Sequence, residues 1–222
     1  MTTPEGRQGD LFAAAGPAPL PPPPLPPPLL RRQLLSWQER LLAHQAPLFA
    51  RAASGPEAAL AAGVSQGVLF AAAASAGPAG GGGGGEAAAS ELASRLNPLE
   101  LRAQSLAFWR WPSAPQQGAA IYLVLDRPAD SASPLVLYVG ETGCADRRWK
   151  GDHDCKHYLA AYSEALGRAE LSTSLSIRFW CDVPGDSRGR RRLEQILIRH
   201  WLPPFNKETR ERWATPFTAD PS

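Results

Sequence analysis

Two short apolar segments joined by a polar loop constrain the fold of this chain more than any other feature. Residues 119–125 read AAIYLVL and residues 135–138 read LVLY, and both are rich in branched and aromatic side chains typical of strands. The connecting residues 126–134, DRPADSASP, carry the Asp, Pro and Ser that turns favour. The pattern predicts two antiparallel strands, each with a tyrosine near a shared edge, Tyr122 and Tyr138.

Three further segments complete a small α+β domain. Residues 153–166 and 188–201 have apolar side chains at helical spacing, and Pro203 and Pro204 end the second helix. Residues 175–183, LSIRFWCDV, have the composition of a third strand. The order of hairpin, helix, strand and helix predicts a three-stranded antiparallel sheet flanked by helices.

Proline and glycine limit the part of the chain that folds. The 222 residues include Pro 23 and Gly 20, concentrated in the first hundred positions, and this composition is typical of low-complexity segments. We therefore expect residues 1–97 to form a largely disordered arm. A short amphipathic helix near residues 30–46, ending at Pro47, would dock on the domain or on a partner. Residues 98–222 would form the folded domain, with its core at residues 118–208.

The composition of the arm also bears on localisation. The uncharged run from Ala58 to Gly85 is long enough for a transmembrane helix, but Ala and Gly dominate it and no Lys or Arg flanks it closely. Glu5 and Asp10 do not fit a secretory signal, and three cysteines without close pairing indicate a reducing compartment. We expect a cytoplasmic protein without a membrane segment.

A pentapeptide near the N-terminus suggests a partner. Residues 8–12 read QGDLF, and Gln8, Leu11 and Phe12 resemble the peptide with which bacterial proteins bind the sliding clamp. A Leu-Phe pair on a disordered arm can anchor in an apolar groove and become ordered on binding. The resemblance implies the clamp as a partner, and a chance match is the alternative.

The hairpin and the segments after it contain five short motifs in a fixed order. They are AIY at 120–122, YVG at 138–140, Arg148, Glu194 and Asn206. With these residues the chain resembles the GIY-YIG nuclease superfamily over residues 118–208, although Ala120 stands where the family has its first glycine. The resemblance implies a GIY-YIG-like fold and a metal-dependent DNA endonuclease that hydrolyses phosphodiester bonds in repair or replication-associated processing. A non-catalytic DNA-binding or scaffolding protein that retains the fold is the alternative.

Glu194 is the candidate that the residues themselves support. On a helical wheel it lies within the apolar face of the last helix, between Ile198 and Trp201. An unpaired carboxylate there costs on the order of several kcal/mol, so it requires a cation. Arg190, one turn earlier, is one candidate, and a single Mg²⁺ or Mn²⁺ ion with oxygen ligands is the other. The resemblance implies the metal ion.

The resemblance also implies roles for Tyr122, Tyr138 and Arg148. One phenol accepts a proton from the attacking water, the other positions the water or the phosphate, and the arginine stabilises negative charge on the phosphate. A phenolate at neutral pH costs roughly 4 kcal/mol unless cations lower the pKa of the phenol. As strand residues, both tyrosines would also fit a purely structural place in the core.

Other polar residues complete the candidate site. His153 would assist the base, with His157 as the alternative, and Asn206 would fix the phosphate or a neighbouring backbone, with an ordinary turn asparagine as the alternative. Histidines and cysteines between Cys144 and His157 also suggest zinc, but their spacing matches no standard tetrahedral site.

Basic residues near the motifs are candidates for contact with DNA phosphates. The net charge of +2 is too small to indicate nucleic-acid binding by itself. The candidates are Arg147, Lys150, Arg190, Arg191 and Arg192. A solvated basic face is the alternative.

Overall fold

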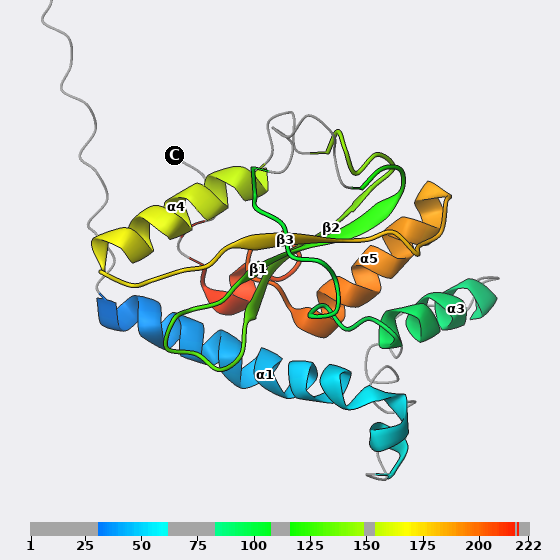
Figure 1. The fold of residues 1–222 in the computed structure, drawn as a ribbon, viewed down its shortest axis with the longest axis horizontal. Helices are drawn as coiled ribbons and strands as arrows, with labels where there is room; N and C mark the ends of the chain where they lie inside the picture. Colours follow the sequence, from blue (N-terminus) through cyan, green and yellow to red (C-terminus); the bar gives the residue numbers. More distant parts are fainter. Residues whose placement is uncertain (1–30, 62–82, 108–115, 149–153, 216, 218–222) are drawn as a thin grey trace, which may run out of the picture.

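The computed structural model describes residues 31–61, 83–107, 116–148, 154–215 and 217. The helices are α1 (Arg31–Ala61), α3 (Gly83–Ser94), α4 (Asp154–Arg168) and α5 (Ser187–Trp201), the strands are β1 (Ala120–Asp126), β2 (Leu135–Thr142) and β3 (Ser176–Trp180), and a 3-10 turn spans Glu211–Trp213 (Figure 1). The predicted clamp peptide with Gln8, Leu11 and Phe12, and also Lys150 and His153, lie outside the described residues. Within the described part, none of the helices combines the length and the apolar character needed to span a bilayer.

The three strands form one antiparallel sheet in the order β2-β1-β3, which confirms the predicted α+β class. Every residue of the central strand β1 is buried, as its nearly continuous apolar sequence requires. Tyr122 lies opposite Gly140, and Tyr138 lies opposite Val124. Because side chains alternate along a strand, the two tyrosines lie on the same face of the sheet, as neighbours along a diagonal.

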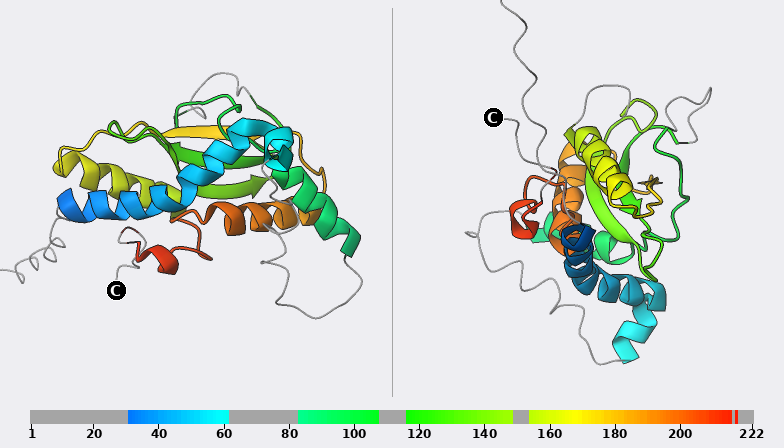
Figure 2. Two further views of the ribbon diagram at one scale, coloured as in Figure 1. Left: turned by 90° about the horizontal axis from the view of Figure 1, so that it is seen from below. Right: turned by 90° about the vertical axis from the view of Figure 1, so that its left-hand side faces the viewer.

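Helices cover both faces of the sheet. The face with Tyr122 packs against α4 and the first part of α1, and the opposite face packs against α5 and α3. Figure 2 shows the beginning of α1 beside the end of α4, where the Arg31 guanidinium donates hydrogen bonds to two carbonyl oxygens of the segment after α4. The core therefore has two layers, one on each side of the hairpin.

Helix α1 differs from the prediction in its length. It does not end at Pro47, and it continues to Ala61. A proline inside a helix costs about 3 kcal/mol, but Leu48 and Phe49 directly after it are buried, and Phe49 packs on Trp201 with 4.6 Å between ring centroids. This tertiary burial offsets the local cost and keeps the chain helical.

The boundary expected between arm and domain also needs correction. Leu34, Trp37 and Leu41 of α1 belong to the same core cluster as Tyr122. Helix α3 begins within the glycine run before Glu86, in the segment expected to be disordered, and it packs against α5. Both helices therefore pack within the domain, and in the described part of the chain its core includes residues before residue 98.

Polar contacts from other segments occupy the two edges of the sheet, through side chains on β2 and through backbone on β3. On β2, the Gln45 amide both donates to and accepts from the backbone of Val136. Asn206 contacts Val139 in the same two-way manner. The backbone of Gln104 forms a bridge with the outer edge of β3. An open edge is a template for pairing with another chain, and these contacts occupy it.

Candidate active site

A pocket of about 370 Å³ opens beside β2 and the beginning of α4. It brings together four residues of the predicted site: Tyr138, Arg148, Glu194 and Asn206. The remaining lining residues are Asp154, Tyr158, Ile198, Phe205, Lys207 and Glu208. The motifs at 138–140, 148, 194 and 206 thus meet in one place although they are far apart in the sequence.

The two tyrosines are in contact, but only one of them lines the pocket. The centroids of their rings are 5.9 Å apart, and Tyr122 is fully buried behind Tyr138. Tyr122 has this place because Gly140 faces it across the hairpin. A Cβ atom at Gly140 would lie 2.4 Å from the phenol of Tyr122, so the ring fits only against a glycine. This contact gives a physical reason for the glycine in YVG.

Arg148 connects the buried tyrosine to the pocket. Its Nε donates a hydrogen bond of 3.0 Å to the hydroxyl oxygen of Tyr122, and its guanidinium carbon lies 5.7 Å from the centroid of that ring. The guanidinium is half-buried and lines the pocket. It can therefore contact the phenol and an anionic ligand at once, because a guanidinium has five donor hydrogens.

The environment separates the acidities of the two phenols. Burial raises the pKa of Tyr122 to about 12, and the charge and hydrogen bond of Arg148 oppose that rise. Burial raises the pKa of Tyr138 further, and the neighbouring Tyr122 adds to the effect. A hydrogen bond between the two phenols lowers the pKa of Tyr122 and raises that of Tyr138, as expected when Tyr138 is the donor. Tyr122 is therefore the phenol that ionises more readily.

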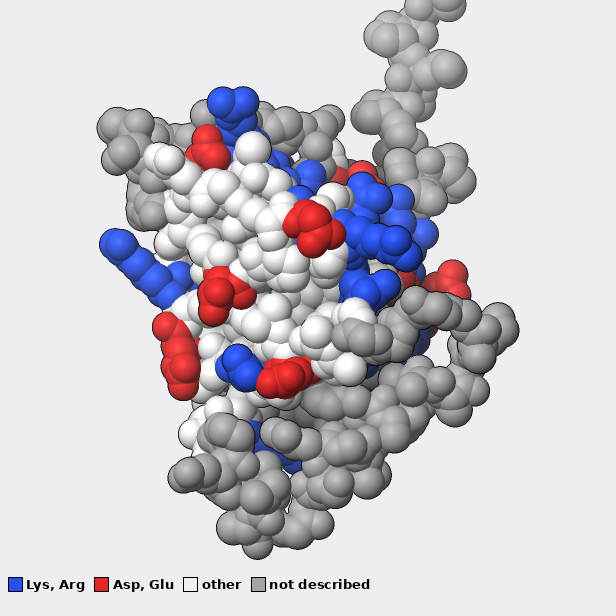
Figure 3. Space-filling model, turned by 90° about the vertical axis from the view of Figure 1, so that its right-hand side faces the viewer, with Lys and Arg blue, Asp and Glu red and all other residues white. Residues whose placement is uncertain are grey.

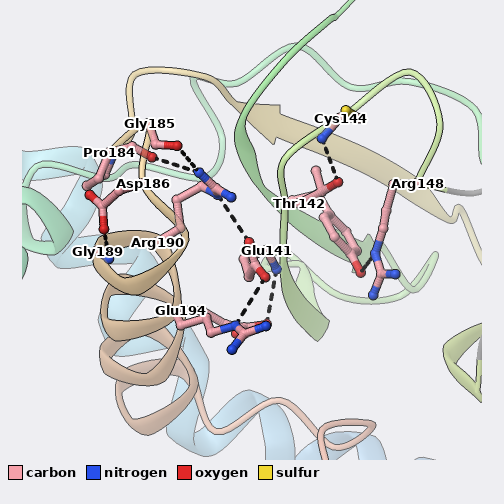
Figure 4. A network of polar contacts seen from close by, with 12 residues as sticks. Glu141, Thr142, Cys144, Arg148, Pro184, Gly185, Asp186, Gly189, Arg190 and Glu194 are labelled. Carbon is pink, nitrogen blue, oxygen red and sulfur yellow. Dashed lines mark hydrogen bonds and ion pairs between the residues drawn. The ribbon is translucent and has the colours of Figure 1, made fainter.

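Glu194 is held by a backbone amide. Its Oε1 accepts a hydrogen bond of 3.0 Å from the N–H of Glu141 on β2 (Figure 4). Burial raises the pKa of Glu194 to about 7, the negative charges of Glu141 and Glu208 add to the rise, and the amide bond and Arg148 oppose it. In the described part of the chain Glu194 forms no ion pair. Arg190, the alternative partner, bonds to Glu141 instead.

The donor set at Glu194 fits a hard divalent cation. A half-buried carboxylate whose pKa is raised by burial and by neighbouring acids becomes more stable in its charged form when a cation is near. The described residues contain no group of three or more His, Cys, Asp or Glu side chains that could hold a metal. An ion here would therefore depend on one carboxylate and retained waters, which Mg²⁺ commonly accepts.

Asn206 supports the strand backbone beside the pocket. It is 4% exposed, and both polar atoms of its amide bond to the backbone of Val139, at 3.0 Å and 2.8 Å. Asn206 was expected to fix either the phosphate or a neighbouring backbone, and these contacts correspond to the second role. Asn206 therefore fixes the strand segment between Tyr138 and Gly140.

The predicted phosphate-contacting arginines divide into two groups. The side chains of Arg147 and Arg191 are 78% and 73% exposed, and Arg192 is half-buried. Arg190 is buried, and its guanidinium bonds to Glu141 and to two backbone carbonyls. The prediction that Arg190 contacts DNA phosphates was therefore wrong. Figure 3 shows a cluster of Lys and Arg on the side of the molecule where α5 begins.

Several polar residues of the site were not predicted, among them Lys207 and Glu141. Lys207 lines the pocket with a 75% exposed side chain, 3.7 Å from Asp154, and Glu141 orients Glu194. Each directly follows a motif residue, Asn206 and Gly140 respectively, and this adjacency was the available signal.

Comparisons of the chain with protein-family models, curated proteins and solved structures find no match. The function has to be inferred from the pocket itself.

Proposed function

We propose that this chain is a metal-dependent endonuclease of the GIY-YIG type that hydrolyses phosphodiester bonds in DNA. The observation that carries the proposal is the convergence of Tyr138, Arg148 and Glu194 on one pocket. A phenol, a guanidinium and a carboxylate can supply the proton transfer, charge stabilisation and cation binding that phosphodiester hydrolysis uses.

Arg148 and Lys207 orient the phosphate. Arg148 already lines the pocket, and its donors can face the oxygen atoms that gain charge as water attacks. Lys207 lines the same pocket and adds a second positive charge to it. Glu194 would hold Mg²⁺ or Mn²⁺, which when bound supplies positive charge to the phosphate and favours ionised phenols.

The tyrosines form a path for the proton of the attacking water. Tyr138 faces the pocket, and its hydroxyl gives its own proton to Tyr122 as it takes one from the water. Arg148 stabilises the Tyr122 phenolate that this step requires. With a pKa of about 12, that phenolate costs about 7 kcal/mol at pH 7. This cost already includes the stabilisation by Arg148, and a cation held at Glu194 would lower it further.

The carboxylates argue against a protein that only binds DNA. Asp154, Glu194 and Glu208 all line the pocket, and three negative groups repel a phosphate. A binding surface gains nothing from them, whereas a nuclease needs at least one to hold a cation. This contrast favours the catalytic function over a DNA scaffold that retains the fold.

The experiment that tests the proposal compares DNA cleavage by the wild type, Glu194→Gln and Glu164→Gln. Glu164 is an exposed carboxylate on α4, paired with Arg168, and serves as the matched control. The substrates are supercoiled plasmid and branched duplexes, each with Mg²⁺, Mn²⁺ or EDTA. We expect cleavage that requires metal, persists in Glu164→Gln and disappears in Glu194→Gln. Equal cleavage by the wild type and Glu194→Gln would refute the proposed site.

A further inference from the structure

Glu194 depends on a strand end for its position. The N–H that bonds its Oε1 belongs to Glu141, the next-to-last residue of β2. β2 is an edge strand, with β1 on one side only. The last residues of an edge strand fray readily, because fewer hydrogen bonds hold them. A carboxylate that binds a cation needs a fixed geometry, so the strand end requires support of its own.

Arg190 supplies that support from the helix that carries Glu194. It lies one turn before Glu194 on α5 and is 6% exposed. Its Nε donates to the Glu141 carboxylate at 3.1 Å, and its Nη1 donates to the carbonyl oxygens of Pro184 and Gly185 at 3.2 Å and 2.5 Å (Figure 4). One guanidinium thus connects the end of β2 to the loop before α5.

The same contacts exclude Glu141 as a second cation ligand. Its Oε2 accepts from Arg190, and its Oε1 lies 3.7 Å from Arg191. The two arginines differ in kind, because Arg190 is buried and makes three hydrogen bonds, whereas the Arg191 side chain is 73% exposed. An exposed pair contributes little to stability or geometry, whereas a buried guanidinium with three hydrogen bonds holds its partners in place. Arg191 is therefore a natural control for Arg190.

We infer that Glu141 and Arg190 are positioning residues, which hold the Glu194 carboxylate in the geometry that binds the divalent cation. The inference rests on the proposed function in that Glu194 is taken as the cation ligand. Outer contacts that orient a ligand commonly change metal affinity tenfold or more when they are removed. Neither residue lines the pocket, and both act through the N–H of Glu141.

The test measures Mn²⁺ binding by electron paramagnetic resonance in the wild type, Arg190→Gln, Arg191→Gln and Glu194→Gln. Plasmid cleavage is measured in parallel as a function of Mg²⁺ concentration. We expect Arg190→Gln to weaken Mn²⁺ binding about tenfold and to raise the Mg²⁺ requirement for cleavage similarly. Arg191→Gln should keep its Mn²⁺ affinity within about twofold of the wild type, because its contact with Glu141 is exposed. Circular dichroism confirms that each variant is folded at the temperature of the titration.

A second variant covers the case in which Arg190→Gln does not fold. Glu141→Ala removes the carboxylate that Arg190 holds but keeps the backbone N–H, and it should weaken Mn²⁺ binding by a similar factor. A purely structural role would lower the urea midpoint and leave the Mn²⁺ affinity of the folded protein unchanged. Wild-type affinity in folded Arg190→Gln, or in Glu141→Ala, would overturn the inference.

The two proposals fail in different ways in this experiment. If the wild type binds Mn²⁺ through Glu194 but cleaves no DNA, the nuclease proposal fails, and the Arg190 variants still decide the inference. If Glu194→Gln loses cleavage while Arg190→Gln matches the wild type in both assays, only the positioning role is refuted.

Discussion

Replacing Glu194 by Gln should stabilise the protein at alkaline pH. The native pKa of Glu194 is raised from 4.5 to about 7, mainly by burial. Between these values the native state binds more protons than the unfolded state, so the free energy of unfolding falls as the pH rises through this window. Gln does not ionise, so the variant lacks this fall. It keeps an oxygen that can accept the Glu141 N–H, so the main structural contact survives.

The size of the effect follows from the same pKa. A rise from 4.5 to about 7 corresponds to about 3 kcal/mol in the free energy of unfolding once the carboxyl is ionised in both states. Glu194 retains some contact with solvent, which screens the charge, so we expect about half of that value. Glu194→Gln should therefore exceed the wild type by about 1–2 kcal/mol at pH 8 and equal it near pH 4.

Urea denaturation followed by tryptophan fluorescence measures this difference. Wild type, Glu194→Gln and the control Glu164→Gln are compared at pH 4.5 and 8, in EDTA and in Mg²⁺. Mg²⁺ should stabilise only proteins that keep the Glu194 carboxylate, because a ligand of the native state raises its stability. A Glu194→Gln variant that is destabilised to the same extent at both pH values would refute the reasoning. The carboxylate would then serve a structural contact and not a cation.

Three other predictions concern the tyrosine pair and a half-buried histidine. Gly140→Ala places a methyl group against the Tyr122 phenol and should destabilise the protein by about 1–3 kcal/mol in urea denaturation, whereas no pH dependence is expected. Arg148→Lys should lower the rate of DNA cleavage about 100-fold or more, because lysine lacks the planar guanidinium that can bond the Tyr122 phenol and a phosphate at once. Circular dichroism should show that the fold of this variant is intact. Burial lowers the pKa of His200 to about 4, so the contribution of His200 to the free energy of unfolding should fall as the pH drops from 6.5 to 4, by about 2 kcal/mol and with a sign opposite to that of the Glu194 contribution. His200→Gln should remove that dependence, and a wild-type slope in this variant would assign it to other groups.

Elements set by local pattern could be predicted from the sequence. The apolar, branched and aromatic side chains of 119–125 and 135–138 predict the hairpin, and the apolar face around Ile198 and Trp201 predicts α5 with Glu194 pointing inward. These signals are local because the periodicity of a strand or helix is contained in the segment itself. The convergence of the motif residues on one pocket agrees with the site expected from them.

Features that depend on distant partners could not be predicted. Pro47 is a strong local stop signal, and only the packing of Phe49 on Trp201 shows why α1 continues. Nothing in the run of arginines at the start of α5 distinguishes buried Arg190 from exposed Arg191, because their difference comes from Glu141 on another element. Likewise, nothing in the sequence around Gln45 indicates that its side chain bonds to β2.

The place of α1 in the core has a consequence for synthesis on the ribosome. Gln45 bonds to Val136, and Gln38 bonds to Tyr162, at sequence separations of 91 and 124 residues. The helix therefore emerges long before the strand and helix that cover it. Long-range contacts of this kind form late and slow the folding of a domain. Until the last third of the chain has been made, the apolar side chains of α1 remain exposed, so the nascent protein should depend on chaperones at this stage.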